Sequence, residues 1–269
     1  MSLGIAFKGP EGIVLAADSR VTLMAQIAGE NMLVPATYDN ATKLLKIAEQ
    51  KYVGAVTYGL GAIGQTQPRT AHSYIPELEE KLKKEGVGRL QVKDFAQRLS
   101  AFFMDRWTAQ MPSAYAGPDM VFLVGGYDDG AAYGSVFEFH IPKIPDPHEW
   151  HVDSFGMVWG GQREFADRII RGFDDQLLQI VQQTLKVSDP DMATLQGQLG
   201  AHLQARIPFA FLPLQDCVDL SIFMIRATIL IQNWLVGVRG VGGAIDVATI
   251  TRTEGFDEVQ RKIIVGETK

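Results

Sequence analysis

The chain has little cysteine, since Cys217 is the only one among 269 residues. A single cysteine excludes an intrachain disulfide framework and a thiolate metal cluster, and it fits a reducing compartment. The five histidines show no H-E-x-x-H spacing, and His148 and His151, three apart in an expected strand, point to opposite faces. We therefore expect a cytoplasmic protein with no metal and no cofactor.

Uninterrupted apolar runs and a basic stripe are lacking too. The longest apolar stretch, LSIFMIRATILIQNWLVGV, contains Arg226, Gln232 and Asn233, which favours a buried helix over a membrane span. The net charge is −6, and lysine and arginine are scattered along the chain. A nucleic-acid partner usually requires a basic patch. We expect binding to neither membrane nor nucleic acid.

A glycine pattern in TYGLGAIGQTQ imitates a dinucleotide-binding turn, because Gly59, Gly61 and Gly64 have the G-x-G-x-x-G spacing. That fingerprint requires a strand, a turn, a helix and a second strand within about 30 residues. Here two helical stretches follow, and the next strand-like run begins only at Met120. The glycines therefore predict a tight turn after a strand and no nucleotide site.

The order of elements predicts an α+β fold. Paired apolar runs indicate hairpins near both 3–17 and 43–58, and a second block of strands follows helical stretches. Two sheets packed face to face and covered by helices would bury every apolar stripe. We expect one domain over residues 1–269, with the proline-rich 141–150 as a loop between strands. The expected strands are 3–8, 12–17, 43–49, 52–58, 120–129, 134–140, 149–154, 156–161, 244–252 and 261–266, and the expected later helices are 163–182, 191–205 and 215–236.

The helix expected over 92–107 carries more aromatic residues than one stripe needs. Phe102 and Phe103 are adjacent and differ in direction by about 100°, and Trp107 lies four residues after Phe103. We predict that this side of the helix is an exposed aromatic patch that makes helix–helix or subunit contacts.

Several segments together resemble the proteasome β-type subunits, which are N-terminal nucleophile hydrolases. The resemblance rests on MSLGIAFKGPEGIVLAADSR, KLLKI, TYGLGAIG and GVGGAIDVATITR, in this order. It implies a four-layer αββα sandwich. It also implies that Ser2 is the nucleophile, sixteen residues before Asp18, and that Lys43 is the buried lysine. The stretch 24–40 then becomes an insertion near the mouth of the site.

The resemblance also assigns supporting roles. Gly59, or its neighbour Tyr58, would donate its amide to the oxyanion, and Arg20 would share the carboxylate of Asp18. The chemistry is consistent, because an N-terminal amine with a pKa of about 8 can act as base for the hydroxyl of its own residue once Met1 is removed. Lys43 would lower the pKa of the Ser2 hydroxyl, and Asp18 would keep Lys43 charged.

Two accessory positions differ from the family pattern. Val238 stands where a carboxylate is usual, and Gly160, a supporting residue, lies where a serine is usual. A second register, which aligns Gly4 and Ile5 with the family's glycine and hydrophobe, would leave the nucleophile position empty. Three functions follow: a proteasome-like peptidase acting on peptides or unfolded proteins, a non-catalytic ring or scaffold subunit, and an amidase acting on a small molecule. For the first two we expect a homo-oligomeric ring, with an unfoldase or activator as a possible partner.

Overall fold

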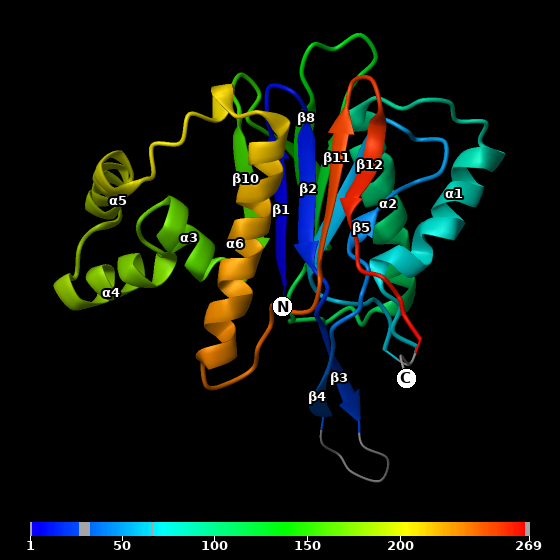
Figure 1. Cartoon of the computed structure of the whole chain (residues 1–269). Coiled ribbons are helices and arrows are strands. Elements are labelled where there is room, and N and C mark those ends of the chain that lie inside the picture. The colour runs from blue at the N-terminus through cyan, green and yellow to red at the C-terminus, as the bar shows by residue number, and fades with distance from the viewer. Residues whose placement is uncertain (1, 27–32, 66, 267–269) are drawn as a thin grey trace. The chain divides into compact units, whose positions relative to one another are not determined.

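The computed structural model describes residues 2–26, 33–65 and 67–266 (Figure 1). The chain divides into two compact units. The larger unit comprises Met1–Gly161 and Phe209–Lys269, and the smaller comprises Gln162–Pro208. The prediction of one domain over 1–269 stays a prediction.

The larger unit contains two five-stranded sheets, and neighbouring strands in them pair antiparallel. The first sheet has the strand order β10-β1-β2-β11-β12, and the second has β5-β6-β7-β8-β9. The first is built from β10 (Gly156–Gly161), β1 (Leu3–Lys8), β2 (Ile13–Asp18), β11 (Ile245–Thr251) and β12 (Gly255–Gln260). The second is built from β5 (Leu44–Leu45), β6 (Val53–Gly59), β7 (Met120–Gly126), β8 (Ser135–Ile141) and β9 (Ile144–Trp150).

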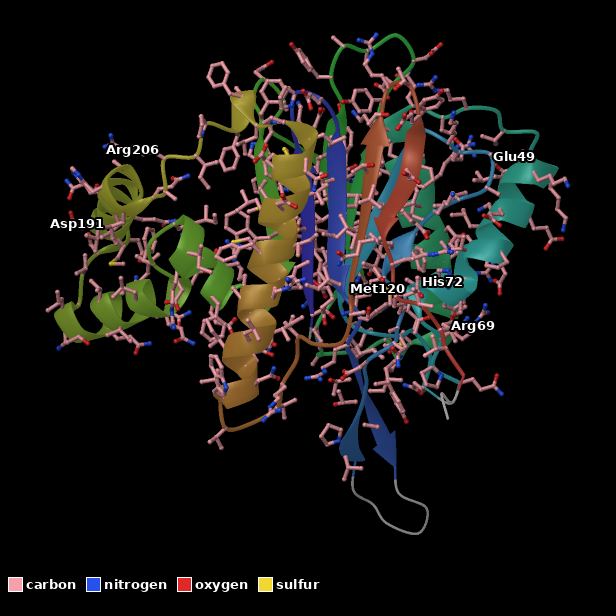
Figure 2. All side chains as sticks on the ribbon, viewed as in Figure 1. Glu49, Arg69, His72, Met120, Asp191 and Arg206 are labelled. Atoms are coloured by element: carbon pink, nitrogen blue, oxygen red, sulfur yellow. The ribbon has the colours of Figure 1, made fainter. Side chains whose placement is uncertain are left out.

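One apolar core joins the two sheets, and another lies between the second sheet and its helices. Leu15 of the first sheet and Val56 of the second belong to the core between the sheets. Met120, labelled in Figure 2, is fully buried in the second core, with residues of α1 (Ile75–Lys84) and α2 (Val92–Gln110). The helix α6 (Leu214–Trp234) contacts β1, β2 and β11 of the first sheet. The mixed α+β character follows from these contacts.

The aromatic residues of α2 are core residues, so the predicted exposed patch is wrong. Phe102, Phe103 and Trp107 are at most 6% exposed. The ring of Phe103 meets Tyr74 edge to face, at the end of the short helix η1 (Ala71–Tyr74), and Trp107 meets Tyr115 in the same way. The segments before and after α2 therefore cover the side of the helix that the sheet leaves open.

One expected loop and one expected strand are also wrong. Residues 141–150 contain the strand β9, and its prolines are tolerated because β9 is an edge strand with no neighbour on one side. Residues 261–266 form no strand, and the last strand is β12 instead. The insertion 24–40 covers the second half of β3 (Val21–Gln26) and all of β4 (Leu33–Tyr38), and these two strands pair with each other. Residues 27–32 of the insertion lie outside the described residues.

The smaller unit is helical, and side-chain N-caps begin two of its helices. It contains α3 (Glu164–Ile170), α4 (Asp175–Leu185) and α5 (Asp189–Leu203). Asp174 caps α4 by accepting from the Leu177 amide, and Ser188 caps α5 by accepting from the Asp191 amide. The short η2 (Phe209–Phe211) precedes α6 in the larger unit.

Candidate active site

The hairpin of β1 and β2 brings the N-terminus beside Asp18. Gly4 pairs with Ala17 across the hairpin, so Ser2, which precedes β1, and Asp18, the last residue of β2, share one end of it. The Leu3 amide donates to Asp18 Oδ1 at 3.1 Å. The sixteen-residue spacing in the sequence therefore corresponds to direct proximity in the fold.

Asp18 is completely buried and accepts four hydrogen bonds from the described residues. Besides the Leu3 amide, the donors are the Arg20 amide at 3.1 Å, the Gly242 amide at 3.0 Å and Lys43 Nζ at 2.6 Å. A buried carboxylate is expensive unless such donors compensate it. Three of the four donors are backbone amides, so the position of this carboxylate is fixed by the chain itself.

Lys43 is the charged partner of this carboxylate. Its side chain is only 7% exposed and belongs to the residue just before β5. Burial lowers the pKa of the Lys43 ammonium, and the charge and hydrogen bond of Asp18 partly offset that effect. A lysine with a lowered pKa is closer to exchanging a proton with a hydroxyl than an exposed lysine is.

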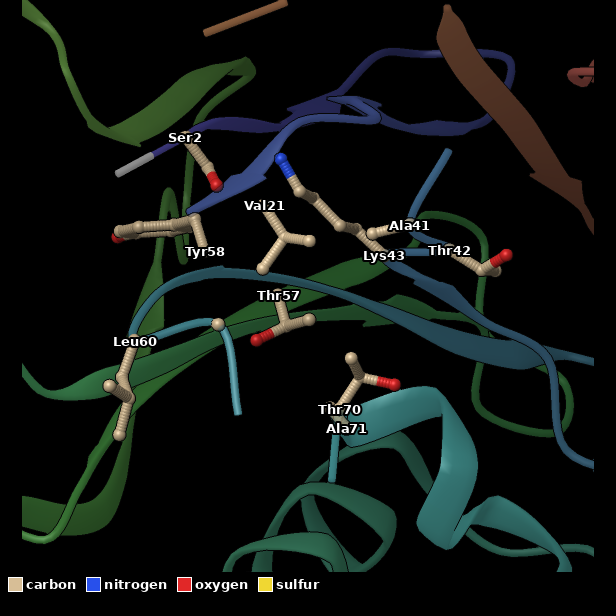
Figure 3. Close-up of a pocket in the computed structure, with 11 residues that line it drawn as sticks. Ser2, Val21, Ala41, Thr42, Lys43, Thr57, Tyr58, Leu60, Thr70 and Ala71 are labelled. Atoms are coloured by element: carbon tan, nitrogen blue, oxygen red, sulfur yellow. The ribbon is translucent and has the colours of Figure 1, made fainter. Parts of the chain in front are cut away.

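Ser2 and Lys43 both line one small cavity (Figure 3). Its volume is about 20 Å³, which is room for about one water molecule. Figure 3 shows Ser2 and Lys43 on one side and Thr57 and Thr70 opposite them, with Val21 between. Ser2 is 4% exposed. The structure thus places the side chain of Ser2 at the same cavity as that of Lys43.

Arg20 does not bind Asp18 as we expected from the sequence. Its backbone amide binds that carboxylate, but its guanidinium pairs with Asp39, with Nε to Oδ1 at 2.5 Å and Nη2 to Oδ2 at 2.8 Å. The hydrogen bond to Asp39 raises the pKa of Arg20, and the same bond lowers the pKa of Asp39. The guanidinium also lies on the bare Cα of Gly242, where a Cβ would overlap it. Arg20 therefore holds the end of the insertion and the Gly242 loop together.

Gly59 ends β6 in the turn that the sequence predicted. Its φ of +84° is favourable for glycine alone, and a Cβ would overlap the carbonyl of Asp119. That carbonyl accepts from the Leu60 amide at 2.8 Å. The flanking residues Tyr58, Leu60 and Gly61 line the cavity with Ser2.

Gly160 lies against the ring of Tyr58. It pairs with Gly4 between β10 and β1, and a Cβ on it would overlap the hydroxyl end of Tyr58. Its bare Cα makes room for that ring.

Sequence reasoning missed Gly242, Asp39 and Asp246. Asp246 accepts from Ser19 Oγ at 3.4 Å and is bound by the side chain of Lys262. Gly242 carried a signal, since it lies in the GVGG segment quoted for the resemblance. Asp246 lies in the longer form of that segment, GVGGAIDVATITR, but neither Asp246 nor Asp39 carried a signal of its own, because a lone aspartate is common at strand ends.

No group of three or more histidine, cysteine or acidic side chains in the described ranges is placed to hold a metal ion. Nor does any helix there have both the length and the apolar character needed to cross a bilayer.

Comparison with known proteins gives one kind of match. No protein-family model and no curated protein matches the chain. Among solved structures, a mutant of Anbu from Hyphomicrobium sp. strain MC1 superposes with a TM-score of 0.58 at 16% sequence identity, covering 100% of this chain and 89% of that one. This similarity shows the fold.

Proposed function

We propose that the protein is a proteasome-like peptidase whose nucleophile is Ser2, and that its larger unit has the four-layer αββα arrangement. The observation that carries the proposal is the burial of Ser2 in one cavity with Lys43, while Lys43 is bound to a carboxylate with four donors. The fold shared with Anbu supports a proteasome-like architecture.

The reaction begins when Met1 is removed, which leaves a free α-amine on Ser2. Ser2 Oγ attacks the substrate carbonyl, and the α-amine takes the hydroxyl proton. The Gly59 amide donates to the oxyanion of the tetrahedral intermediate, an interaction typically worth about 3 to 4 kcal/mol. The intermediate then expels the amine product, which takes the proton from the α-ammonium and leaves an ester on Ser2.

Hydrolysis of the ester completes the cycle. Water attacks the ester carbonyl and gives its proton to the α-amine, and Ser2 Oγ leaves and recovers that proton. Lys43 stabilises the developing alkoxide in both steps, because its Nζ is held at 2.6 Å from Asp18 within the same cavity. The products are an amine and a carboxylic acid, with no redox change.

The cavity also suggests the substrate's side chain. Val21, Thr57 and Gly61 leave only about 20 Å³ beside Ser2, and Thr57 uses its hydroxyl to donate to the Val121 carbonyl at 2.9 Å. A Cβ on Gly61 would overlap Val21, so these two surfaces are already in contact. Since Lys43 is neutralised by Asp18, the wall offers no net charge. We infer that the residue on the acyl side of the cleaved bond is small and neutral.

The decisive experiment is intact-mass analysis with and without a peptide boronate that carries alanine at its reactive end. We expect loss of Met1 and one boronate adduct per chain in the wild type. Ser2→Ala should also lose Met1 but form no adduct. Ser221→Ala is the matched control, because Ser221 is a buried serine that donates within α6, and it should behave as the wild type.

Retention of Met1 without any adduct would contradict the peptidase and favour a non-catalytic ring or scaffold subunit. Cleavage of small amides but not of peptides would favour an amidase.

We further propose a cytoplasmic homo-oligomeric ring that encloses Ser2 and receives substrate from an unfoldase or activator. The fold similarity to Anbu supports assembly. The exposed aromatic patch gives no support, because its residues are buried in the core. Light scattering on a sizing column tests the ring, and a mass near 29.6 kDa would contradict it.

A further inference from the structure

A buried tyrosine connects the nucleophile's strand to the oxyanion turn. Tyr58 is the last residue of β6 before Gly59, it is 7% exposed, and it lines the cavity that contains Ser2. Its side chain belongs to the core between the sheets. It therefore extends from the second sheet toward β1 and β10 of the first.

Two glycines, Gly4 and Gly160, make room for this ring, and Gly161 lies beside it. A Cβ on Gly4 would lie 2.7 Å from Tyr58 Cδ1, and one on Gly160 would overlap the hydroxyl end. A Cβ on Gly161 would lie 3.5 Å from Cδ2 and would overlap the Ser2 carbonyl. Gly4 and Gly160 are register partners, so the ring lies over a paired glycine step next to Ser2. Any larger residue at Gly4 or Gly160 would displace it.

The hydroxyl of Tyr58 is held by a carboxylate. It donates to Glu138 Oε1 at 2.7 Å, and Glu138 Oε2 accepts from Trp150 Nε1 at 2.7 Å. His140 Nε2 lies 3.1 Å from Glu138 Oε1. Burial acts to raise the pKa of Glu138, but the hydrogen bonds from His140, Tyr58 and Trp150 bring it below its usual value. The acceptor is thus a carboxylate at neutral pH, which makes the bond to Tyr58 charge-assisted.

The same network returns to the oxyanion turn. His140 Nδ1 lies 3.9 Å from Asp119 Oδ2. The backbone carbonyl of Asp119 accepts from the Leu60 amide, and Gly59 packs on it. Tyr58, Glu138, His140 and Asp119 therefore form a loop of contacts that starts and ends at the Gly59 turn.

We propose that Tyr58, held by Glu138, is a positioning residue that fixes the Gly59 turn relative to Ser2. The inference rests on the proposed function. One side of the ring supports the nucleophile's strand, and the backbone of the same residue leads into the oxyanion donor. A shift of either strand moves both, since a fixed ring and a fixed hydroxyl leave Tyr58 one orientation.

The test compares Tyr58→Phe with Tyr127→Phe. Tyr127 is the matched control, because it is 1% exposed and belongs to the same core between the sheets. Tyr58→Phe should lower kcat, or the rate of boronate adduct formation, by on the order of tenfold to a hundredfold with little change in KM, as expected for an interaction that matters in the transition state. Tyr127→Phe should leave both unchanged. Glu138→Gln, which keeps an acceptor oxygen, should retain more activity than Glu138→Ala.

A second measurement does not need activity. Hydrogen exchange of the peptide spanning 57–64 should be faster in Tyr58→Phe and Glu138→Ala than in the wild type, and unchanged in Tyr127→Phe. Equal kinetics and equal exchange in the two tyrosine variants would overturn the positioning role. If the wild type neither cleaves nor forms an adduct, the proposed function fails. In that case the exchange result alone decides whether Tyr58 holds the turn.

Discussion

Each end of strand β1 has a buried lysine, and the two lysines are held very differently. At one end Lys43, 6% exposed, binds the Asp18 carboxylate beside Ser2. At the other end Lys8, 5% exposed, donates to two backbone carbonyls, those of His151 at 2.6 Å and Val152 at 3.2 Å. Burial lowers the pKa of both lysines.

The difference between the two ends is the reason for proposing the Lys43 end as the site. A buried lysine with a lowered pKa occurs twice, so burial alone does not distinguish chemistry from structure. The Lys43 end adds a carboxylate held by three backbone amides and a cavity with a hydroxyl. The Lys8 end uses its charge to hold a loop between β9 and β10. A charged partner together with an open space beside it is the more specific signal.

The largest expected effect comes from removing each ammonium in turn. Lys43→Met should lower the rate of Ser2 adduct formation by about a thousandfold or more, because the alkoxide loses its counter-charge and linked catalytic groups fail together. Lys8→Met should lower thermal stability and leave the rate nearly unchanged. Kinetics of boronate labelling, with unfolding monitored by circular dichroism, measures both.

Folding of the Lys43 variant needs its own control. Lys43→Met leaves Asp18 buried without its counter-ion, which costs about 3 to 5 kcal/mol. The double variant Lys43→Met with Asp18→Asn removes that charge and should recover stability without recovering the rate. Equal rate losses at Lys43 and Lys8 would show that the two ends do not differ in function.

A change in cavity size should produce an intermediate effect. Val21→Ala removes two methyl groups from the wall beside Ser2, so the preferred acyl-side residue should shift from alanine toward valine or leucine. We expect selectivity to change by about tenfold or more, as is usual for one methylene in an apolar pocket. Val14→Ala, toward the Lys8 end of the β1–β2 hairpin and fully buried, should lower stability without changing selectivity. Hydrolysis of a peptide series varied at this residue gives the answer, and a wild type that prefers phenylalanine would contradict the inferred pocket.

The smallest effect concerns pH and lies at the Lys8 end. Burial lowers the pKa of His151 below its ordinary 6.5, against a weaker opposing effect of a backbone hydrogen bond with Met157. The unfolded chain therefore binds this proton more readily, so His151 makes the protein less stable as the pH falls below about 6.5.

His151→Asn should remove that slope, which is at most about 1.4 kcal/mol per pH unit. Asparagine suits the position because His151 has a φ of 54°. Urea unfolding at several pH values between 5 and 7 measures the slope, with His72→Asn at an exposed histidine as the control. An unchanged slope in His151→Asn would exclude this residue as the cause.

The sequence predicted those strands whose apolar residues form a continuous short segment. The short apolar run LGIAFK predicted β1 with its observed bounds, and GMVWGG predicted β10. Ser2, Asp18 and Lys43 were predicted by resemblance, and the structure brings them together at one end of a hairpin. Whether they catalyse a reaction remains a prediction.

Other parts depended on contacts that no local pattern encodes. The Gly242 amide reaches Asp18 across 224 residues, and Tyr58 reaches Glu138 across 80. The side of α2 that we expected to be exposed is covered by Tyr74 and Tyr115, which lie outside the helix. The prolines of β9 excluded a central strand but not an edge strand, and only the sheet order distinguishes the two.

The hairpin of β3 and β4 occupies most of the sequence between Asp18 and Lys43. Asp18 and Lys43 are 25 residues apart, yet their side chains touch. Val21 at the start of the hairpin pairs with Tyr38 at its end, next to Asp39, which holds Arg20. The chain thus leaves the site along β3 and returns beside it along β4. The number of residues between the aspartate and the lysine therefore reflects the length of this hairpin. The distance between the two side chains is set instead by the pairing of the first and last residues of the hairpin.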